Sequence, residues 1–222
     1  MTNKQAILEK ARAYVFQELN GEVSGHDWWH IHRVTNLART IAQKEGADLF
    51  ICELAALLHD LADGKLNETE AIGLQKVQTW LAINGLETQD QDHIMDIIEH
   101  LSFKGGNQTQ TVSTLEGQVV QDADRLDALG AIGIARTMAY SGHTGRPIHD
   151  PAMQPREQLT LEEYRSGQDT AIMHFYEKLL KLKDRMNTTT AKELAQERHQ
   201  FLETYLEQFY GKRPITRYLP IK

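Results

Sequence analysis

The sequence is poor in several residue types, and each shortage excludes a class of protein. Of 222 residues only Cys52 is a cysteine, so neither an intrachain disulfide nor a cysteine-rich zinc site can form. The longest apolar stretch, around residues 54–58, is far shorter than the roughly 20 residues that span a bilayer. The chain has no long Lys/Arg block and a net charge of −7, which argues against a general nucleic-acid-binding surface.

The composition is that of a globular protein, with 41% hydrophobic and 25% charged residues. The first ten residues, MTNKQAILEK, lack the apolar segment of a signal peptide, so we expect a cytoplasmic protein with no membrane association. A chain of this length buries about 70% of the surface that its unfolded form exposes, and it needs no structural metal. Any metal that it binds is therefore expected to be functional.

Apolar residues recur with a helical period along nearly the whole chain, and no strand-like alternation of useful length appears. Gly46 is predicted to cap one helix, and Asn67 with Glu70 to begin another as a capping box. The pattern predicts helices over about residues 7–19, 31–45, 51–61, 67–84, 90–101, 115–139, 172–186 and 194–209. We expect an all-α fold with a single domain over residues 1–222. Its bundle core covers about 20–140, an irregular loop about 140–160, and a C-terminal helical hairpin about 161–211.

His-Asp dipeptides occur three times, and only one of them lies in an apolar helix. His59 and Asp60 end the segment ELAALLHDLAD, whereas the pairs at 26–27 and 149–150 lie in polar segments, where capping or solvation explains them. A buried carboxylate must be paired, hydrogen-bonded or bound to a cation. One interpretation pairs Asp60 with a basic residue and makes His59 a hydrogen-bonded core residue. The other is a metal site.

Two further helices favour the metal site. His30 lies one turn before Val34 on an apolar helix face, and Asp124 and Asp127 flank the apolar stripe of QDADRLDALG. Imidazoles and carboxylates from three interior helices form a mixed ligand set that suits a divalent transition ion or Mg²⁺. Four protein ligands on an octahedral ion leave two positions for water and substrate, as catalysis requires.

The order of these residues resembles the H…HD…D signature of the HD-domain metal-dependent phosphohydrolases, an all-α superfamily. Three segments carry the likeness over roughly residues 20–140: HDWWHIHRVTNLA, AALLHDLAD and VVQDADRLDALG. The segment MHFYEKLLKLKDRMNT is similar to the C-terminal helices of a bacterial subgroup that includes nucleotide pyrophosphatases. The resemblance implies a divalent ion, one of Mn, Mg, Co, Ni, Fe or Zn. The implied metal ligands are His30, His59, Asp60 and Asp124.

The same resemblance implies a catalytic role for Asp63, three residues after the HD aspartate, in orienting or deprotonating the attacking water. An acid at a helix C-terminus opposes the helix dipole, which favours a functional reason for Asp63 over a purely structural one. Lys65 is assigned to the catalytic site beside it, because phosphate charge must be met by cations. The candidate substrate contacts are Arg33, His100, Lys104 and Arg146.

His93 and His100 raise the question of a second metal, because some members of the family insert two histidines in this interval. Those histidines usually come from separate segments, whereas these two lie seven residues apart on one helix face. We therefore predict one metal, with His100 at the edge of the site. The loop at 140–160 holds three of the five prolines, and its Arg146, with His143 and His149, is predicted to close over a substrate.

We predict a hydrolase in which a metal-activated water attacks a phosphorus of a nucleotide or similar small phosphoester. The C-terminal similarity favours nucleoside triphosphate pyrophosphohydrolysis. A nucleotidase or phosphatase is an alternative. A hydrolase of guanosine polyphosphate alarmones is another, although those relatives carry a Glu-Asp pair where this chain reads LADGKL. Alternatives of other classes are a nucleotide-binding regulator with little turnover and an all-α interaction protein. The expected partner is a small phosphorylated molecule, and a homodimer stays open.

Overall fold

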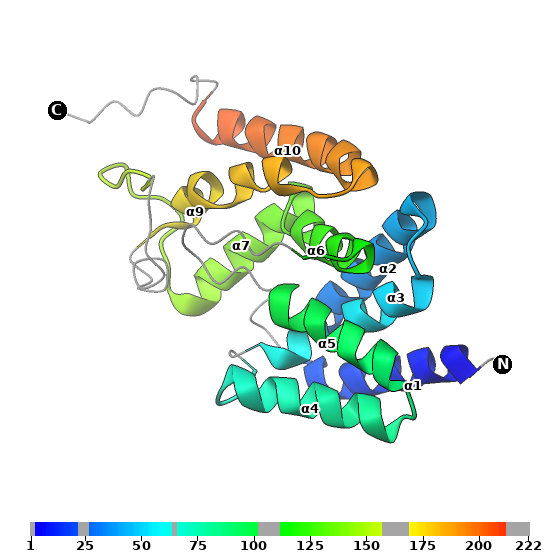
Figure 1. Cartoon of the computed structure of the whole chain (residues 1–222). Coiled ribbons are helices and arrows are strands. Elements are labelled where there is room, and N and C mark those ends of the chain that lie inside the picture. The colour runs from blue at the N-terminus through cyan, green and yellow to red at the C-terminus, as the bar shows by residue number, and fades with distance from the viewer. Residues whose placement is uncertain (1–2, 22–26, 64–65, 102–111, 157–168, 212–222) are drawn as a thin grey trace. The chain divides into compact units, whose positions relative to one another are not determined.

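A computed structural model of the protein describes residues 3–21, 27–63, 66–101, 112–156 and 169–211. These residues are mostly helical and contain no strand, which confirms the predicted all-α fold (Figure 1). The helices are α1 (Asn3–Leu19), α2 (Trp28–Glu45), α3 (Leu49–Leu58), η1 (His59–Ala62), α4 (Glu70–Ile83), α5 (Thr88–Leu101), α6 (Leu115–Asp127), α7 (Gly130–Thr144), α9 (Ala171–Glu177), η2 (Leu179–Lys181), η3 (Lys183–Arg185) and α10 (Thr189–Phe209). Among the described residues, no helix is long and apolar enough to cross a membrane.

The chain divides into two compact units. The first contains residues 1–22, 26–103 and 109–124, and the second contains residues 23–25, 104–108 and 125–222. Helix α6 supplies residues to both, because the division falls between Asp124 and Arg125. All four predicted metal ligands therefore belong to the first unit.

Helix α3 is the core of the first unit, as its apolar circumference predicted. Every residue of α3 except Leu49 is buried, and the helix packs against α1, α2 and α5. Asp48 caps its N-terminus, because the carboxylate accepts hydrogen bonds from the backbone N–H groups of Phe50 and Ile51 at 2.8 and 3.1 Å. The segment that leads to the His-Asp pair is thus held on three sides and fixed at its start.

One buried acid joins three helices of this unit. Glu53 of α3 accepts two hydrogen bonds of 2.7 Å from Arg39 of α2 and one of 3.1 Å from Arg12 of α1. The hydrogen bonds from Arg39 hold the pKa of Glu53 below its usual value, although burial acts in the opposite direction. The ion pairs keep the buried carboxylate charged.

Helix α2 ends at Gly46 as predicted but begins at Trp28, three residues before the predicted start. The Asp27 carboxylate accepts a hydrogen bond of 2.8 Å from the backbone N–H of His30, and Gly46 closes the helix with a left-handed φ of 78°. Asp150 similarly accepts from the backbone N–H of Ala152 at 2.8 Å. Local capping therefore accounts for the aspartates of the two polar His-Asp dipeptides, as predicted.

The single helix predicted over 115–139 is wrong, because the chain turns between α6 and α7. Gly130 begins α7 with a φ of 67°, which favours glycine, and α7 then continues to Thr144. A Cβ on Gly133 would lie 2.2 Å from the carbonyl oxygen of Ala128. The two glycines thus permit a sharp turn between the helices.

Two other predicted helix limits are also corrected. The helix expected over 172–186 ends at Glu177, because Lys178 leaves the helical region, and two short 3₁₀ turns follow. Thr69, and not Asn67, caps α4, because its hydroxyl accepts from the backbone N–H of Ile72. The Asn67 amide instead donates to the carbonyl oxygens of Leu61 and Asp63, at 2.8 and 2.9 Å.

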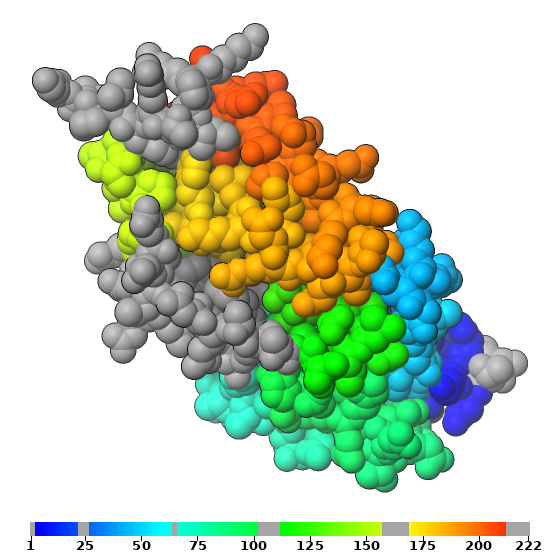
Figure 2. Space-filling view, turned by 45° about the horizontal axis from the view of Figure 1, so that its top comes forward, coloured from blue at the N-terminus to red at the C-terminus, as the bar shows by residue number. Residues whose placement is uncertain are grey.

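The second unit packs α7 against α9 and α10. Phe175 of α9 stacks on Tyr205 of α10, with ring centroids 5.5 Å apart, as expected of a C-terminal hairpin. Figure 2 shows the orange surface of α10 directly beside the yellow residues that begin at α9. The part of the irregular segment that the structure describes, 145–156, is held by the ion pairs Arg146–Asp169 and Arg156–Glu177, both at 2.9 Å.

Candidate metal centre

The structure brings the four predicted ligands together. His30 lies on α2, His59 and Asp60 begin η1 directly after α3, and Asp124 lies on α6. Nε2 of His30 is 3.3 Å from Asp60 Oδ2 and 3.5 Å from Asp124 Oδ1. Nε2 of His59 is 3.2 Å from Asp60 Oδ1 and 3.9 Å from the same Asp124 oxygen.

The separations between Asp60 and the two histidines suit ligand atoms arranged around one cation, and Asp124 approaches the histidines from beside this group of three. Two ligand atoms about 2.1 Å from an ion are about 3.0 Å apart at right angles and about 4.2 Å apart when opposite. Ligand atoms of His30, His59 and Asp60 all lie within 4.8 Å of one another. Nε2 of His59 is buried and makes no hydrogen bond within the described residues, although the Asp60 oxygen is near. The buried Nε2 lone pair therefore points toward the carboxylates, as it would in a residue that could ligate a cation together with them.

The local fold prepares His59 as a ligand. Its Nδ1 lies 2.8 Å from the carbonyl oxygen of Ala56, an acceptor that requires the ring proton on Nδ1. The lone pair is then on Nε2, the atom that faces Asp60 and Asp124. This contact forms because α3 ends one residue before His59 and the chain tightens into the 3₁₀ turn η1.

The cluster is buried on one side and accessible on the other. His30, His59 and Asp60 are buried, whereas the side chain of Asp124 is 38% exposed. Burial lowers the local dielectric around the imidazoles and strengthens their interaction with a cation. Water or a substrate could therefore approach through the Asp124 side of the cluster.

Asp63 lies one 3₁₀ turn after Asp60, as its spacing predicted. It caps η1 with extended backbone angles, and its N–H donates to the carbonyl oxygen of Asp60 at 2.9 Å. Its own carbonyl oxygen accepts from the Asn67 amide at 2.9 Å and from the N–H of Leu66 at 3.0 Å. These bonds fix the backbone of Asp63 beside the ligand cluster, and the residue is half-buried.

The other residues predicted for the site lie in several parts of the chain. Arg33 is half-buried on α2, one turn after His30, and His100 is exposed at the end of α5 with its Nδ1 2.8 Å from the carbonyl oxygen of Asp96. Arg146 lies in the second unit, where it pairs with Asp169. Two predicted residues, Lys65 and Lys104, lie outside the described residues. The catalytic and substrate-binding roles of these residues stay predictions.

Three other residues with possible chemistry lie apart from the ligand cluster. His93 contacts Thr114, with Nε2 and Oγ1 3.0 Å apart, and neither His93 nor His100 belongs to the ligand cluster found among the described residues. Burial raises the pKa of the Cys52 thiol, so this cysteine is a protonated core residue and no nucleophile. Sequence reasoning missed the Ala56 carbonyl that orients His59, because a backbone partner leaves no trace in residue type.

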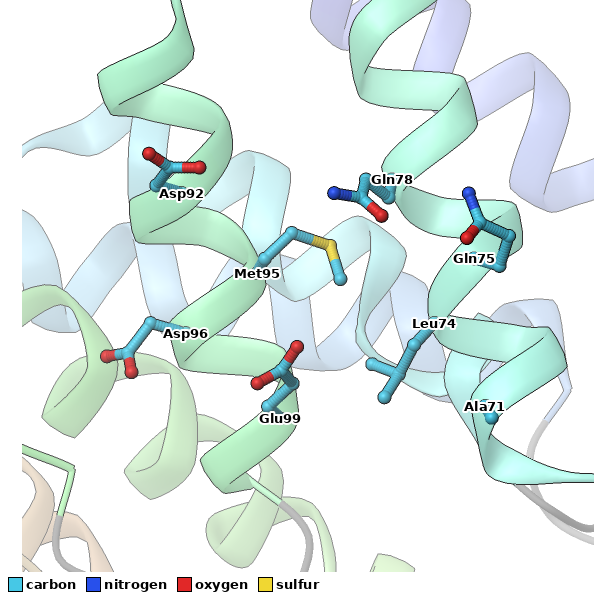
Figure 3. A pocket seen from close by; sticks show the side chains of 8 residues that line it. All are labelled: Ala71, Leu74, Gln75, Gln78, Asp92, Met95, Asp96 and Glu99. Atoms are coloured by element: carbon cyan, nitrogen blue, oxygen red, sulfur yellow. The ribbon is translucent and has the colours of Figure 1, made fainter.

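A separate groove of about 410 Å³ lies between α4 and α5. Figure 3 shows carboxylates of α5 across from glutamines of α4. Its lining residues are Ala71, Leu74, Gln75, Gln78, Asp92, Met95, Asp96 and Glu99. All eight are neutral or acidic, so this groove would repel a polyphosphate, and the ligand cluster is the better candidate for a phosphate site.

Comparison with known proteins supports the motif-based assignment. A model of the HD domain matches residues 28–129, a range that contains all four candidate ligands. YpgQ of Bacillus subtilis, a protein described as uncharacterized, is 42% identical over 206 residues, which are 92% of each chain. Its crystal structure in complex with ADP has a TM-score of 0.75 and covers 96% of this chain and 98% of that one.

Two further crystal structures are similar over nearly the whole chain. A protein from Lactobacillus plantarum is 46% identical, with a TM-score of 0.84 over 93% of this chain and 96% of that chain. An HD-superfamily hydrolase from Bacillus thuringiensis is 45% identical, with a TM-score of 0.74 over 94% and 97% of the respective chains. The chain therefore belongs to the HD-domain family and is a member of the HD-superfamily hydrolases.

Proposed function

We propose that the protein is a metal-dependent phosphohydrolase that cleaves nucleoside triphosphates into a nucleoside monophosphate and pyrophosphate. The observation that carries the proposal is the buried convergence of His30, His59 and Asp60 with Asp124 at its accessible side. The complex of the relative YpgQ with ADP supports a nucleotide as the ligand. The similarity of residues 173–188 to the C-terminal helices of nucleotide pyrophosphatases favours cleavage between the α and β phosphorus atoms.

The four clustered side chains would hold the metal, with Asp60 offering both of its oxygens toward histidine nitrogens 3.2 and 3.3 Å away. When bound, a divalent ion supplies charge that polarises a phosphoryl oxygen and acidifies water. Ala56 keeps His59 in the tautomer that ligation needs, because its carbonyl oxygen accepts the Nδ1 proton. The dry imidazole side of the cluster limits access by bulk water, since His30 and His59 are buried.

Asp63 is the proposed acceptor of the proton of the attacking water. Its backbone is fixed to Asp60 and Asn67 by hydrogen bonds of 2.9 Å, so its carboxylate is held within one turn of the ligands. Arg33, one turn after His30, is the proposed partner of the phosphate charge, and Lys65, Lys104 and His100 are proposed to add to it. Positioning and charge neutralisation are the main requirements of phosphoryl transfer.

The test is a substrate panel on protein that has been stripped of metal and resupplied with Mn²⁺, Co²⁺ or Mg²⁺. We expect nucleoside triphosphates to yield pyrophosphate and a monophosphate, as identified by ion-exchange chromatography. If inorganic phosphate is the sole inorganic product, the protein is a phosphatase and the proposed pyrophosphohydrolysis is wrong. Exclusive turnover of guanosine polyphosphates would establish the alarmone alternative. Failure with every phosphoester and every metal would reject the enzymatic proposal.

A matched pair of variants ties turnover to the cluster. Asp60→Asn removes one charge from the buried cluster, and Asp92→Asn makes the same change on the exposed surface of α5. We expect Asp60→Asn to lower kcat by at least about a hundredfold and to lose bound metal, because a ligating carboxylate is replaced by a weaker neutral ligand. Asp92→Asn should keep both metal and turnover. Full metal content in Asp60→Asn would contradict the ligand assignment.

A further inference from the structure

An exposed aromatic group lies at the start of α2, directly beside the first candidate ligand. Trp29 is 61% exposed, and Phe16 of α1 is 42% exposed. Phe16 contacts Trp28 with ring centroids 5.6 Å apart, and His32 lies 6.0 Å from Trp28 and 5.9 Å from Trp29. Single exposed apolar residues are ordinary, but a contiguous group of rings marks a surface that binds something.

The helical positions of these residues connect the indole to the metal centre. Successive residues of an α-helix are about 100° apart, so Trp29 lies about 100° from His30 around the axis of α2. Arg33 lies between them, about 60° from His30 and about 40° from Trp29. Around α2 there follow, in order, the buried candidate ligand His30, the half-buried guanidinium of Arg33 and the exposed indole of Trp29. That order matches a metal-bound phosphate, a further phosphate and a base.

The distances suit one nucleotide. Side chains extend to about 5–6 Å from the helix axis, so an arc of about 100° corresponds to about 9–10 Å along the surface. A ribose and its first phosphates bridge a gap of this order. An occupant that is anionic at one end and flat and aromatic at the other is complementary to Arg33 and Trp29 together.

The indole has one aromatic neighbour, His32, on the same helix. The ring of His32 contacts it at an interplanar angle of 85°, and the Asp27 carboxylate caps the same helical turn. The contact with His32 occupies only part of the indole, because 61% of the residue stays exposed. An aromatic side chain has only two rotatable bonds, so it loses little conformational entropy when it binds a second ring.

We infer that Trp29 stacks on the nucleobase of a nucleotide whose phosphates lie at Arg33 and the candidate metal centre. This inference rests on the proposed function. Stacking recognises the π-face that every base has, so it predicts similar affinities for purine and pyrimidine nucleotides with the same number of phosphates. Base choice at this position is therefore broad.

The experiment measures binding and needs no turnover. ADP and inorganic tripolyphosphate, which has no base, are titrated calorimetrically into the wild type, Trp29→Ala, Trp29→Phe and the surface control Ile83→Ala, whose side chain is 75% exposed on α4. We expect Trp29→Ala to weaken ADP binding about tenfold or more and to leave tripolyphosphate binding unchanged. Trp29→Phe should retain ADP affinity within about threefold, and Ile83→Ala should match the wild type.

Equal ADP affinity in the wild type and Trp29→Ala would overturn the inference, as would equal weakening of ADP and tripolyphosphate. Unchanged ADP binding together with a shift from dimer to monomer in Trp29→Ala would instead assign the aromatic group to contact between copies of the chain. The proposed function is judged separately, from wild-type turnover. If Trp29→Ala binds ADP as the wild type does and the wild type hydrolyses nucleotides, only the stacking inference fails. If Trp29→Ala weakens ADP but not tripolyphosphate binding and the wild type hydrolyses nothing, only the proposed function fails.

Discussion

Two buried carboxylates of the first unit are compensated in different ways. Glu53 is paired with guanidinium groups of Arg39 and Arg12, whereas Asp60 faces the imidazoles of His30 and His59. Both arrangements meet the requirement that a buried charge has a partner. Only the second arrangement could bind a metal ion, because an imidazole can share a cation with a carboxylate and a guanidinium cannot.

The pair between Glu53 and Arg39 gives a stability prediction. We expect Glu53→Gln to lower the free energy of unfolding by about 2 kcal/mol at pH 7, because hydrogen bonds to charged groups contribute about 1.5–3 kcal/mol. The pKa of Glu53 is lowered in the folded state, so this contribution is complete above the unfolded value of about 4.3 and is lost as the pH falls through the folded pKa. Urea unfolding of both proteins at pH 7 and at low pH measures the difference.

The control for this prediction is Glu9→Gln, the same change at an exposed position of α1. It should change the free energy of unfolding by no more than about 0.5 kcal/mol. A difference between wild type and Glu53→Gln that stays constant down to low pH would contradict the role of the lowered pKa.

At the residue scale, the sequence could predict a functional residue only where its type and its apolar surroundings already indicate a role. A histidine and a carboxylate inside an apolar helix need compensation, so His30, His59, Asp60 and Asp124 stood out, and the structure brings them together. The partners of Glu53 are 14 and 41 residues away on other helices, and their choice follows from packing. The exposure of Trp29 could not be predicted either, because an aromatic residue at an apolar spacing is ordinarily buried.

At the scale of elements, helices with strong apolar periods and clear caps were predicted well, and helix breaks were not. Gly46 ends α2 as expected, since glycine adopts the left-handed conformation without strain. The turn after α6 was missed because the apolar period continues across it. Glycine is compatible with both a helix and a turn, so Gly130 and Gly133 alone did not decide between them.

Two glycines of α7 should respond oppositely to the same substitution. In Gly133→Ala the new Cβ would lie 2.2 Å from the Ala128 carbonyl oxygen, so the backbone of the turn must move, at a cost of about 1–3 kcal/mol. In Gly142→Ala the Cβ meets nothing within 4 Å, and we expect a gain of about 0.5–1 kcal/mol from helix propensity. Thermal and urea unfolding of both variants and the wild type measure these changes in the free energy of unfolding. Equal effects in both variants would show that the α6–α7 turn tolerates a Cβ at 133.

At the scale of the whole molecule, the division of the chain places every candidate ligand in the first unit. Asp124 is the last residue of that unit, and Arg125, its neighbour on α6, belongs to the second. The ligands come from α2, η1 and α6, which are far apart in the sequence. A cation shared by these three elements would therefore oppose the unfolding of the first unit as a whole, because unfolding would disperse its ligands.

Hydrogen exchange measures this effect directly. With free Mn²⁺ at about 100 times its Kd, binding stabilises the native state by about 2.7 kcal/mol, so amides that exchange only through unfolding of the first unit should slow about a hundredfold. Peptides from the buried helix α3 are the ones to follow, since α3 packs on α1, α2 and α5 and contains no ligand itself. In His59→Ala the slowing should disappear, while His93→Ala, which removes a histidine outside the cluster, should retain it. If Mn²⁺ still slows amide exchange in α3 of His59→Ala, the ion binds elsewhere on the protein. The proposed metal site formed by α2, η1 and α6 would then be wrong.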